Sequence, residues 1–331
     1  MKSDYKGIWV FAEQENGKLH QTVLELLAKS KELQRHNGEK IIAVLLGADV
    51  AALADTLFAY GADAVLLAES EALREYSARP YQKALTELAE KYKPSIILYG
   101  ATPLGRDLAP RMMVTLDTGL TADAIDLGYD EDGVFYQTTP GYGGKILAHI
   151  VILERRPQMA TVHPQICEPL EPVNGAKGEL IVENLTVERD AEYEVLETLP
   201  AEKSGESLTA AKVVVAGGRG VKNEDDLTML RELAELLGGQ IASSRPLVDN
   251  GMLPHDRQIG QSGTTVTPQL MFNIAISGSV QYQLGMQKAK CIVAINQSED
   301  APIYDIAHIG AVVDFKKLIP ALIAEIKARK Q

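Results

Sequence analysis

The sequence predicts an α/β protein with two doubly wound, mostly parallel-sheet domains, and three observations lead to this prediction. Short apolar runs alternate with amphipathic stretches along the first hundred residues, and the alternation restarts after residue 211. The chain has 331 residues, more than one hydrophobic core usually serves. The segment 190–211 is acidic and poor in large apolar residues, as exposed linkers are. We therefore expect one domain over 1–200 and a smaller one over 201–331.

In the first domain, apolar runs predict strands at 7–11, 41–46, 64–67 and 95–99, and amphipathic stretches predict helices at about 20–36, 49–60, 80–92 and 105–115. Between about 120 and 168 the pattern changes to alternating apolar and polar residues with turn signals, as in 133–138, 145–153 and 159–163. Because a period of two is typical of half-buried strands, this region predicts an antiparallel hairpin extension of the first domain.

The second domain begins with a buried-type strand at 212–216. Asn223 is expected to cap a helix over 224–237, which the glycine pair 238–239 ends. Further strands are expected at 240–243, 271–276, 291–295 and 311–313, and further helices at 278–286 and 315–329. These elements predict a second doubly wound unit that is smaller than the first.

Composition excludes several classes of function. The formal net charge of −12 opposes binding to nucleic acid and to anionic lipid. No stretch predicts a membrane-spanning helix or a signal peptide, so we expect a cytoplasmic or organelle-matrix protein without stable membrane insertion. The two cysteines are far apart and the six histidines are dispersed, so no metal site is expected. If electrons pass through this chain, an organic cofactor must carry them.

Residues typical of a ligand site follow the strands of the second domain. They lie at 217–220, 243–246, 277–279 and 296–298, with a further loop at 258–263. Ligands of doubly wound sheets bind beyond the carboxyl ends of the strands. Glycines there let the backbone approach a ligand closely, and helix N-termini donate backbone N–H groups to phosphate. Each loop alone could be only a tight turn, but together they predict a dinucleotide site. A third glycine is missing after Gly218, and no P-loop lysine is present, so classical NAD and ATP sites are disfavoured.

The same segments carry a family resemblance. Gly-Gly-Arg-Gly at 217–220, Gln-Ile-Gly-Gln-Ser-Gly at 258–263 and Ile-Ser-Gly-Ser-Val-Gln at 276–281 resemble, in order and spacing, the FAD domain of electron transfer flavoprotein alpha subunits, the family that includes FixB. Ser-Arg at 244–245, Ala-Pro-Ile at 301–303 and Val-Asp at 313–314 add to the likeness. A weaker resemblance covers the first domain through 105–111 and 161–164.

The resemblance implies how the chain binds FAD. Arg219 would lie over the flavin ring and favour its electron-rich reduced forms, although without these motifs it would be interpreted as a surface arginine paired with Glu224 or Asp225. Ser262 would place a hydroxyl near the flavin N5, and Arg245 is either a second flavin contact or a loop anchor. The complete set implied is Arg219, Ser244, Arg245, Ile259, Gly260, Gln261, Ser262, Ser277, Gly278, Ser279, Val280, Gln281, Tyr282, Asn296, Asp314 and Phe315.

Three positions depart from the commonest family pattern. Tyr282 stands where many relatives have a histidine near the flavin O2, and Gln297 stands where a lysine is frequent. Ser262 replaces a threonine. A phenol can still donate a hydrogen bond but stays neutral at pH 7, so these differences affect the tuning of the flavin more than its binding.

The resemblance also implies the function. The chain would be the FAD-binding half of a heterodimer with an electron transfer flavoprotein beta subunit, an electron carrier rather than a stand-alone enzyme. It would deliver electrons to an acyl-CoA dehydrogenase-type flavoenzyme, as in fatty acid β-oxidation, with the FAD domain swivelling on the linker at 190–211. Electron bifurcation with NADH through the beta subunit stays open. The alternatives are an NAD- or adenylate-binding α/β enzyme and a scaffold subunit without a ligand.

Overall fold

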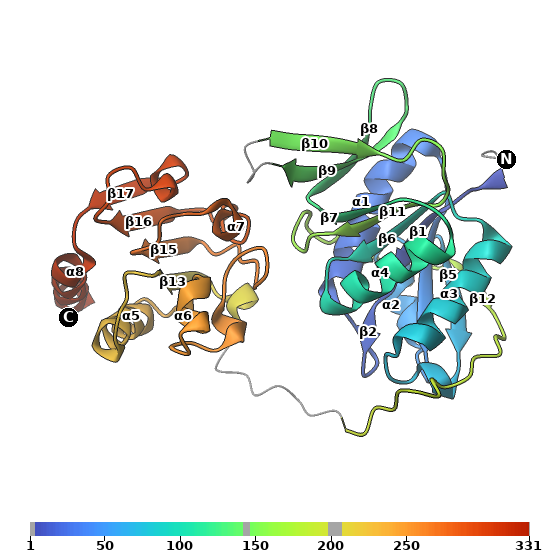
Figure 1. Ribbon diagram of the computed structural model, residues 1–331, viewed down its shortest axis with the longest axis horizontal. Helices are drawn as coiled ribbons and strands as arrows, with labels where there is room; N and C mark the ends of the chain where they lie inside the picture. The colour runs from blue at the N-terminus through green and yellow to red at the C-terminus, as the bar shows by residue number, and fades with distance from the viewer. Residues whose placement is uncertain (1–3, 142–145, 198–206, 331) are drawn as a thin grey trace. The chain divides into compact units, whose positions relative to one another are not determined.

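The computed structural model describes residues 4–141, 146–197 and 207–330. The chain forms two compact units, Met1–Thr198 and Leu199–Gln331 (Figure 1). The domain boundary expected at residues 200 and 201, within the linker segment 190–211, lies outside the described residues. In the described part of the chain, no helix is long and apolar enough to span a bilayer.

The first unit is built on a seven-stranded sheet in the order β12-β5-β4-β1-β6-β11-β7, in which every neighbouring pair is parallel. Its strands are β1 (Ile8–Phe11), β4 (Ile41–Gly47), β5 (Ala64–Glu69), β6 (Ile96–Gly100), β7 (Leu120–Ala124), β11 (Gln158–Val162) and β12 (Glu179–Val182). The helices are α1 (Gln21–Asn37), α2 (Leu53–Ala59), α3 (Ala78–Tyr92) and α4 (Pro103–Thr115).

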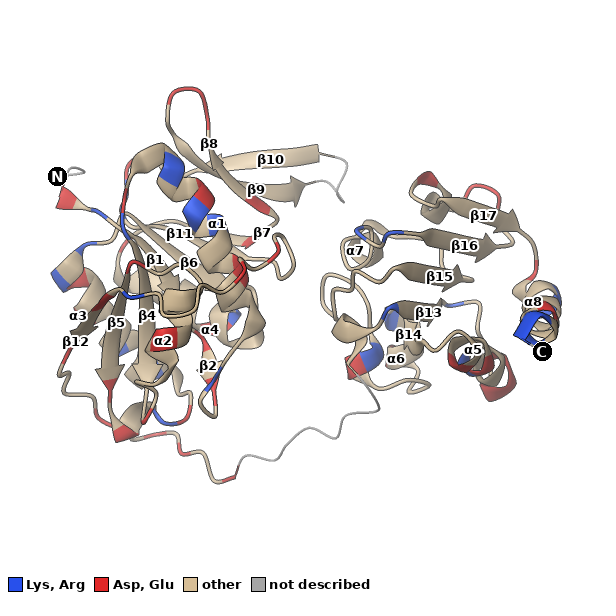
Figure 2. Ribbon diagram, turned by 180° about the vertical axis from the view of Figure 1, so that it is seen from behind, with Lys and Arg blue, Asp and Glu red and all other residues tan. Residues whose placement is uncertain are grey.

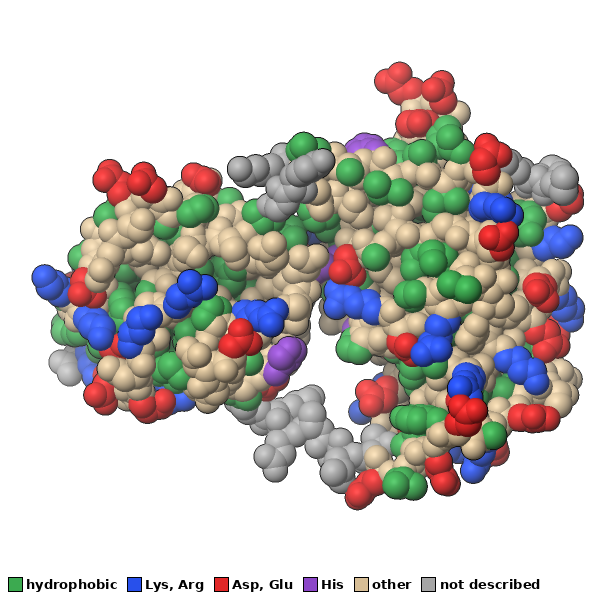
Figure 3. All heavy atoms as spheres, viewed as in Figure 1, with side chains coloured by type: hydrophobic (Ala, Val, Ile, Leu, Met, Phe, Trp, Pro, Cys, Tyr) green, Lys and Arg blue, Asp and Glu red, His purple; other side chains and the backbone are tan. Residues whose placement is uncertain are grey.

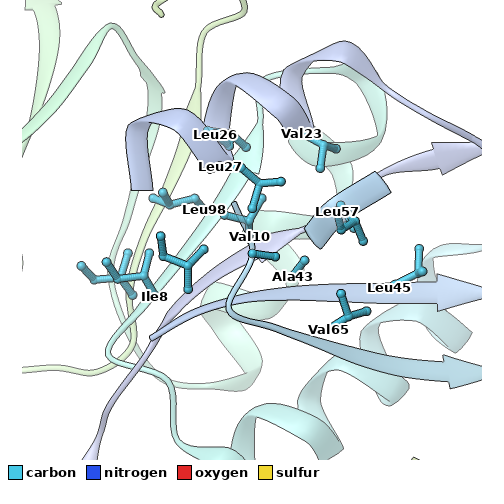
Figure 4. Packing of buried hydrophobic residues seen from close by; sticks show 14 of the residues in the cluster. Ile8, Val10, Val23, Leu26, Leu27, Ala43, Leu45, Leu57, Val65 and Leu98 are labelled. Carbon is cyan, nitrogen blue, oxygen red and sulfur yellow. The ribbon is translucent and has the colours of Figure 1, made fainter. Parts of the chain in front are cut away.

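Helices cover both faces of this sheet. Alternate residues of each strand point to opposite faces, so neighbouring side chains of one strand are buried in different apolar clusters. Ile8 and Val10 of β1 belong to one apolar cluster, which includes Leu27 of α1 (Figure 4). Trp9 and Phe11 belong to a second cluster with residues of α3 and α4. The short continuous apolar runs of the sequence are thus strands covered on both faces, as the fold class predicts.

The predicted antiparallel extension exists, but it is smaller than expected. Strands β8 (Asp126–Tyr129), β9 (Phe135–Gly141) and β10 (Ile146–Val151) form an antiparallel sheet in the order β10-β9-β8. The run 159–163, which the sequence assigned to this region, instead forms β11, a buried parallel strand between β6 and β7. Its five residues are all buried, so its alternation does not mark an exposed face. Strand β12 and the small hairpin of β2 (Gln14–Glu15) and β3 (Lys18–Leu19) were not predicted.

The second unit has a five-stranded parallel sheet in the order β14-β13-β15-β16-β17. Its strands are β13 (Val213–Gly217), β14 (Gln240–Ser243), β15 (Leu270–Ile274), β16 (Ile292–Asn296) and β17 (Ile309–Val312). Its helices are α5 (Glu224–Leu236), α6 (Arg245–Asp249), α7 (Val280–Gln283) and α8 (Phe315–Lys330). Short 3₁₀ helices are η2 (Glu71–Leu73) in the first unit, and η4 (Leu208–Ala210), η5 (His255–Arg257) and η6 (Pro302–Asp305) in the second unit.

Local sequence explains how α5 and α8 begin and end. Asn223 caps α5, because its Oδ1 accepts a 2.9 Å hydrogen bond from the backbone N–H of Asp226, as predicted. Acidic residues fill the first turn of α5, and three basic residues fill the last turn of α8 (Figure 2). Both sets oppose the partial charges of the helix ends.

The helix expected at 278–286 is reduced to α7, four residues long. Gly278 has a φ of +82°, so the chain cannot be helical there. A Cβ on Gly285 would lie 2.4 Å from the backbone nitrogen of Gly260, so this residue is held against another loop. Packing against neighbouring loops therefore limits the helix at both ends.

Candidate cofactor site

A cavity of about 590 Å³ lies at the carboxyl ends of the second unit's strands, within the size range of ligand pockets. Segments that follow all five strands contribute to it, as expected for a doubly wound sheet. Its lining is Arg219, Gly220, Lys222, Ser244, Pro246, Ala275, Ile276, Ser277, Gly278, Ser279, Tyr282, Ile295, Asn296, Gln297, Val313, Asp314, Phe315 and Lys316.

The loop after β13 places Arg219 at this cavity. A Cβ on Gly218 would lie 2.1 Å from the carbonyl oxygen of Ala275, so only glycine lets this loop pack against the loop after β15. The side chain of Arg219 is exposed and has no ion pair or hydrogen bond among the described residues. Glu224, one of its two possible partners, pairs with Arg231 instead. Arg219 is therefore available to a ligand.

The loop after β15 contributes Ser277, Gly278 and Ser279. A Cβ on Gly278 would lie 2.5 Å from the backbone nitrogen of Ile303, and that nitrogen donates a 3.0 Å hydrogen bond to the carbonyl oxygen of Ser277. Both serine side chains are exposed. The glycine thus brings the loop against 301–303 and leaves two hydroxyl groups at the cavity.

Two predicted side chains at the cavity are engaged within the protein. Nδ2 of Asn296 donates a 2.8 Å hydrogen bond to the carbonyl oxygen of Ile276 and so ties two loops of the cavity together. Tyr282 is buried, and its hydroxyl group donates a hydrogen bond into the sheet, to Asn273. We expected this hydroxyl group to be a possible donor to the flavin. In the structure it instead donates to Asn273, which is not a lining residue of the cavity.

The start of α8 forms one wall of the cavity. Oδ1 of Asp314 accepts a 2.9 Å hydrogen bond from the backbone N–H of Lys316, and Phe315 is buried. The amine of Lys316 pairs with Asp226 at 2.8 Å. Burial raises the pKa of Asp226, but Lys316 and the backbone N–H groups of Lys222 and Asn223 outweigh it, so this pKa lies below its ordinary value.

Seven predicted residues lie outside the lining. Oγ of Ser262 accepts a 3.1 Å hydrogen bond from Nε2 of Gln258, and the backbone N–H of Gln261 donates to the carbonyl oxygen of Gln281. Arg245 is exposed and pairs with Asp249 in the next turn of α6 at 3.2 Å. The loop around 259–262 is therefore held against α7 beside the cavity. The residues outside the lining are Arg245, Ile259, Gly260, Gln261, Ser262, Val280 and Gln281.

Sequence reasoning missed Lys222 and Lys316 as lining residues. Their positions could have identified them, since Lys222 lies two residues after the motif at 217–220 and Lys316 lies in the first turn of the last helix. With Arg219 they are the cationic side chains of the lining, and Asp314 is its acidic one. The donor set is rich in hydroxyl, amide and cationic groups, which suits a phosphate-bearing ligand better than a metal ion. The described residues contain no group of three or more potential metal ligands.

Comparison with known proteins agrees with this geometry. Residues 8–188 match the family model described as electron transfer flavoprotein domain, and residues 207–287 match the electron transfer flavoprotein FAD-binding domain. The electron transfer flavoprotein subunit alpha of Thermoanaerobacterium thermosaccharolyticum is 42% identical over 99% of this chain and 100% of its own length. The chain belongs to the electron transfer flavoprotein alpha subunit family.

Other members of the family differ in their names. Protein FixB of Rhizobium meliloti is 43% identical over 96% of this chain and 92% of its own length. The lactate dehydrogenase (NAD(+),ferredoxin) subunit LctC of Acetobacterium woodii is 40% identical over 98% of this chain and 78% of its own length.

FAD is the cofactor of this electron transfer flavoprotein domain. The residues present fit such a group. The cavity lies where the fold binds nucleotides, and glycines at 218 and 278 let its loops pack closely. Arg219 and Lys222 of the lining have no ion pair with any other described residue, which suits an anionic ligand. When bound, FAD supplies the redox chemistry, which no side chain of the lining can supply.

Proposed function

We propose that this chain carries electrons between flavoenzymes, with FAD held in the cavity of the second unit and an acyl-CoA dehydrogenase-type enzyme as one partner. Most residues that line the cavity lie within 207–287, the segment that matches the family's FAD-binding domain, and this overlap carries the proposal. Asp314, the acidic residue of the lining, accepts a hydrogen bond from the backbone N–H of Lys316 at the start of α8. Transfer of electrons alone needs neither a nucleophile nor a general base.

The chain's own residues would bind and tune the cofactor. The charge of Arg219 favours electron-rich forms of a nearby ring and so raises its reduction potential. Ser244, Ser277 and Ser279 offer hydroxyl groups at the cavity, while Asp314 and Asn296 fix the loops that bound it. These groups orient a ligand without reacting with it.

Strand β10 is the surface that best fits the beta subunit. It has exposed apolar side chains, among them Ile146 at 54%, Leu147 at 59% and Val151 at 42% exposure, and it carries no Asp, Glu, Lys or Arg (Figure 3). It is also an edge strand, and β9 is its one partner among the described strands. Unpaired apolar edges associate with other chains, and heterodimers are the assembly of this family, so the beta subunit is the occupant proposed.

The purified complex with the beta subunit tests this function. It should be yellow, accept electrons from a reduced donor flavoenzyme and pass them to an acceptor in a stopped-flow assay. A colourless protein that binds NAD would support a nucleotide-dependent enzyme, and a protein that binds neither would support a scaffold role.

A second candidate function is electron bifurcation with NADH through the beta subunit. The observation that favours it is the 40% identity to LctC, whose name includes NAD(+) and ferredoxin. Ferredoxin reduction that depends on NADH and on a third partner enzyme would support this function, and its absence with ferredoxin and NADH both present would contradict it.

A further inference from the structure

The helices that begin at or near the cavity are poorly suited to binding an anion. The 16-residue α8 begins at the cavity wall, but there the carboxylate of Asp314 accepts the backbone N–H of Lys316. A dianion such as the diphosphate of FAD is often bound by the N-terminus of a helix. Here α7 has four residues, too few for a substantial helix dipole. The longer α5 has Glu224, Asp225 and Asp226 in its first turn, and these carboxylates occupy the place where an anion would bind. The compensating charge must therefore come from side chains.

Three cationic side chains line the cavity, but they are not equivalent. Lys316 is neutralised by Asp226, whose side chain is only 5% exposed. Lys222 and Arg219 are exposed and have no ion pair or side-chain hydrogen bond within the described ranges. Two uncompensated positive charges thus remain at the cavity. If Arg219 serves the flavin ring, as the family resemblance implies, Lys222 is left for the phosphates.

The backbone of Lys222 is fixed, although its side chain is exposed. Its N–H donates a 3.0 Å hydrogen bond to Oδ2 of Asp226. The preceding Val221 is buried and its N–H donates a 3.0 Å hydrogen bond to the carbonyl oxygen of Gly218. The carboxylate of Asp226 therefore has two partners. Its Oδ2 accepts the backbone N–H of Lys222, and its Oδ1 pairs with the amine of Lys316.

We propose that Lys222 is the counter-charge for the diphosphate of FAD in this chain, and that Asp226 selects it by pairing with Lys316. This inference rests on the proposed function, since it requires FAD in this cavity. It also accounts for Gln297, a neutral lining residue at a position where the family resemblance implies that lysine is frequent. The charge absent from that position would be supplied by Lys222, two residues after the 217–220 motif.

The test compares FAD with riboflavin, which has the same ring and no phosphate. Binding of each is titrated calorimetrically to the full-length chain with its beta subunit, after removal of flavin. Lys222→Gln should weaken FAD binding about tenfold, the usual effect of losing a charge-assisted contact. It should leave riboflavin binding unchanged, and Lys222→Arg should restore FAD binding. Lys317→Gln, which removes an exposed lysine outside the lining, is the matched control.

Each outcome decides a different point. Equal FAD binding by native protein and Lys222→Gln overturns the inference, and so does an equal loss of FAD and riboflavin, which would mean a general disturbance of the cavity. The FAD defect of Lys222→Gln should also shrink as salt is raised, because screening weakens the native contact. Failure of the native complex to bind FAD would overturn the proposed function itself.

Discussion

The hydroxyl group of Tyr282 donates a 2.6 Å hydrogen bond to Oδ1 of Asn273, which is fully buried in β15. Nδ2 of Asn273 in turn donates a 3.2 Å hydrogen bond to the carbonyl oxygen of Val293 in β16. Burial raises the pKa of Tyr282 well above its ordinary value, so the phenol is neutral. Tyr282 thus anchors α7 to the sheet.

This relationship predicts a split between stability and redox behaviour. Tyr282→Phe should lower the free energy of unfolding by about 1–3 kcal/mol, because Oδ1 of Asn273 loses its donor inside the core. The flavin potential should be unchanged. Denaturant titration and potentiometry of the same sample measure both quantities, and a potential shift without a loss of stability would contradict the assignment.

Arg219→Ala should lower the flavin potential. A charge at about 4 Å contributes about 1 kcal/mol in water and about 4 kcal/mol near a protein surface, which corresponds to roughly 40–170 mV for one electron. The exposure of Arg219 favours the lower part of this range. Arg231→Ala is the control, since Arg231 pairs with Glu224 outside the lining. Equal potentials for the two variants would remove the role assigned to Arg219.

Gly278→Ala should be more destabilising than Gly251→Ala. Both glycines have positive φ, +82° and +72°, so both substitutions incur about 1–2 kcal/mol of backbone strain. Only the new Cβ at 278 meets backbone, 2.5 Å from the nitrogen of Ile303, whereas Gly251 has open space. The difference in melting temperature between the two variants measures the steric contribution at 278. FAD affinity should fall for Gly278→Ala and stay unchanged for Gly251→Ala. Similar losses for both would show that the 301–303 segment moves freely.

Asp226 should make the second unit sensitive to acid. Because its folded pKa is lowered, its carboxylate stabilises the fold above the unfolded value of 3.8, and this contribution is lost as pH falls through the folded pKa. Asp226→Asn should reduce the free energy of unfolding at neutral pH and flatten its decline below about pH 4. Asp225→Asn, an exposed neighbour, should keep the native pH profile. Two parallel profiles for native protein and Asp226→Asn would contradict this prediction.

Leu147→Lys on β10 should weaken assembly with the beta subunit, because a charge would have to be buried at the interface. Val182→Lys on β12 is a matched control, since Val182 is also an exposed apolar residue, at 57%, on an edge strand. Sedimentation velocity of mixed subunits measures the difference. Dissociation caused by Val182→Lys but not by Leu147→Lys would place the interface at β12, in the seven-stranded sheet, and contradict the assignment to β10.

Periodicity and turn residues predicted much of this fold. Parallel strands such as β4 and β16 are short apolar runs, and the cap at Asn223 is readable because its partner, Asp226, is three residues away. The position of β11 was misjudged, because the strand includes the polar residues Gln158 and Thr161, which are buried, and so its sequence resembles a half-exposed strand. The length of α7 could not be predicted from the sequence either, because Gly278 and Gly285, on either side of it, pack against loops that are distant in the sequence.

For the cofactor site, the sequence by itself determined where a ligand could bind, because strand ends and glycine-rich loops are local features, and it determined the family through the motifs at 217–314. Only the tertiary structure decided which side chains there are available. Lys316 and Lys222 look alike in the sequence, but Asp226 pairs with the amine of Lys316, whereas the amine of Lys222 has no ion pair with another described residue. The hydroxyl group of Tyr282 is likewise taken up by Asn273, nine residues away in a different element. Hydrogen bonds and ion pairs join residues that approach only when the chain folds, so their partners cannot be read from local pattern.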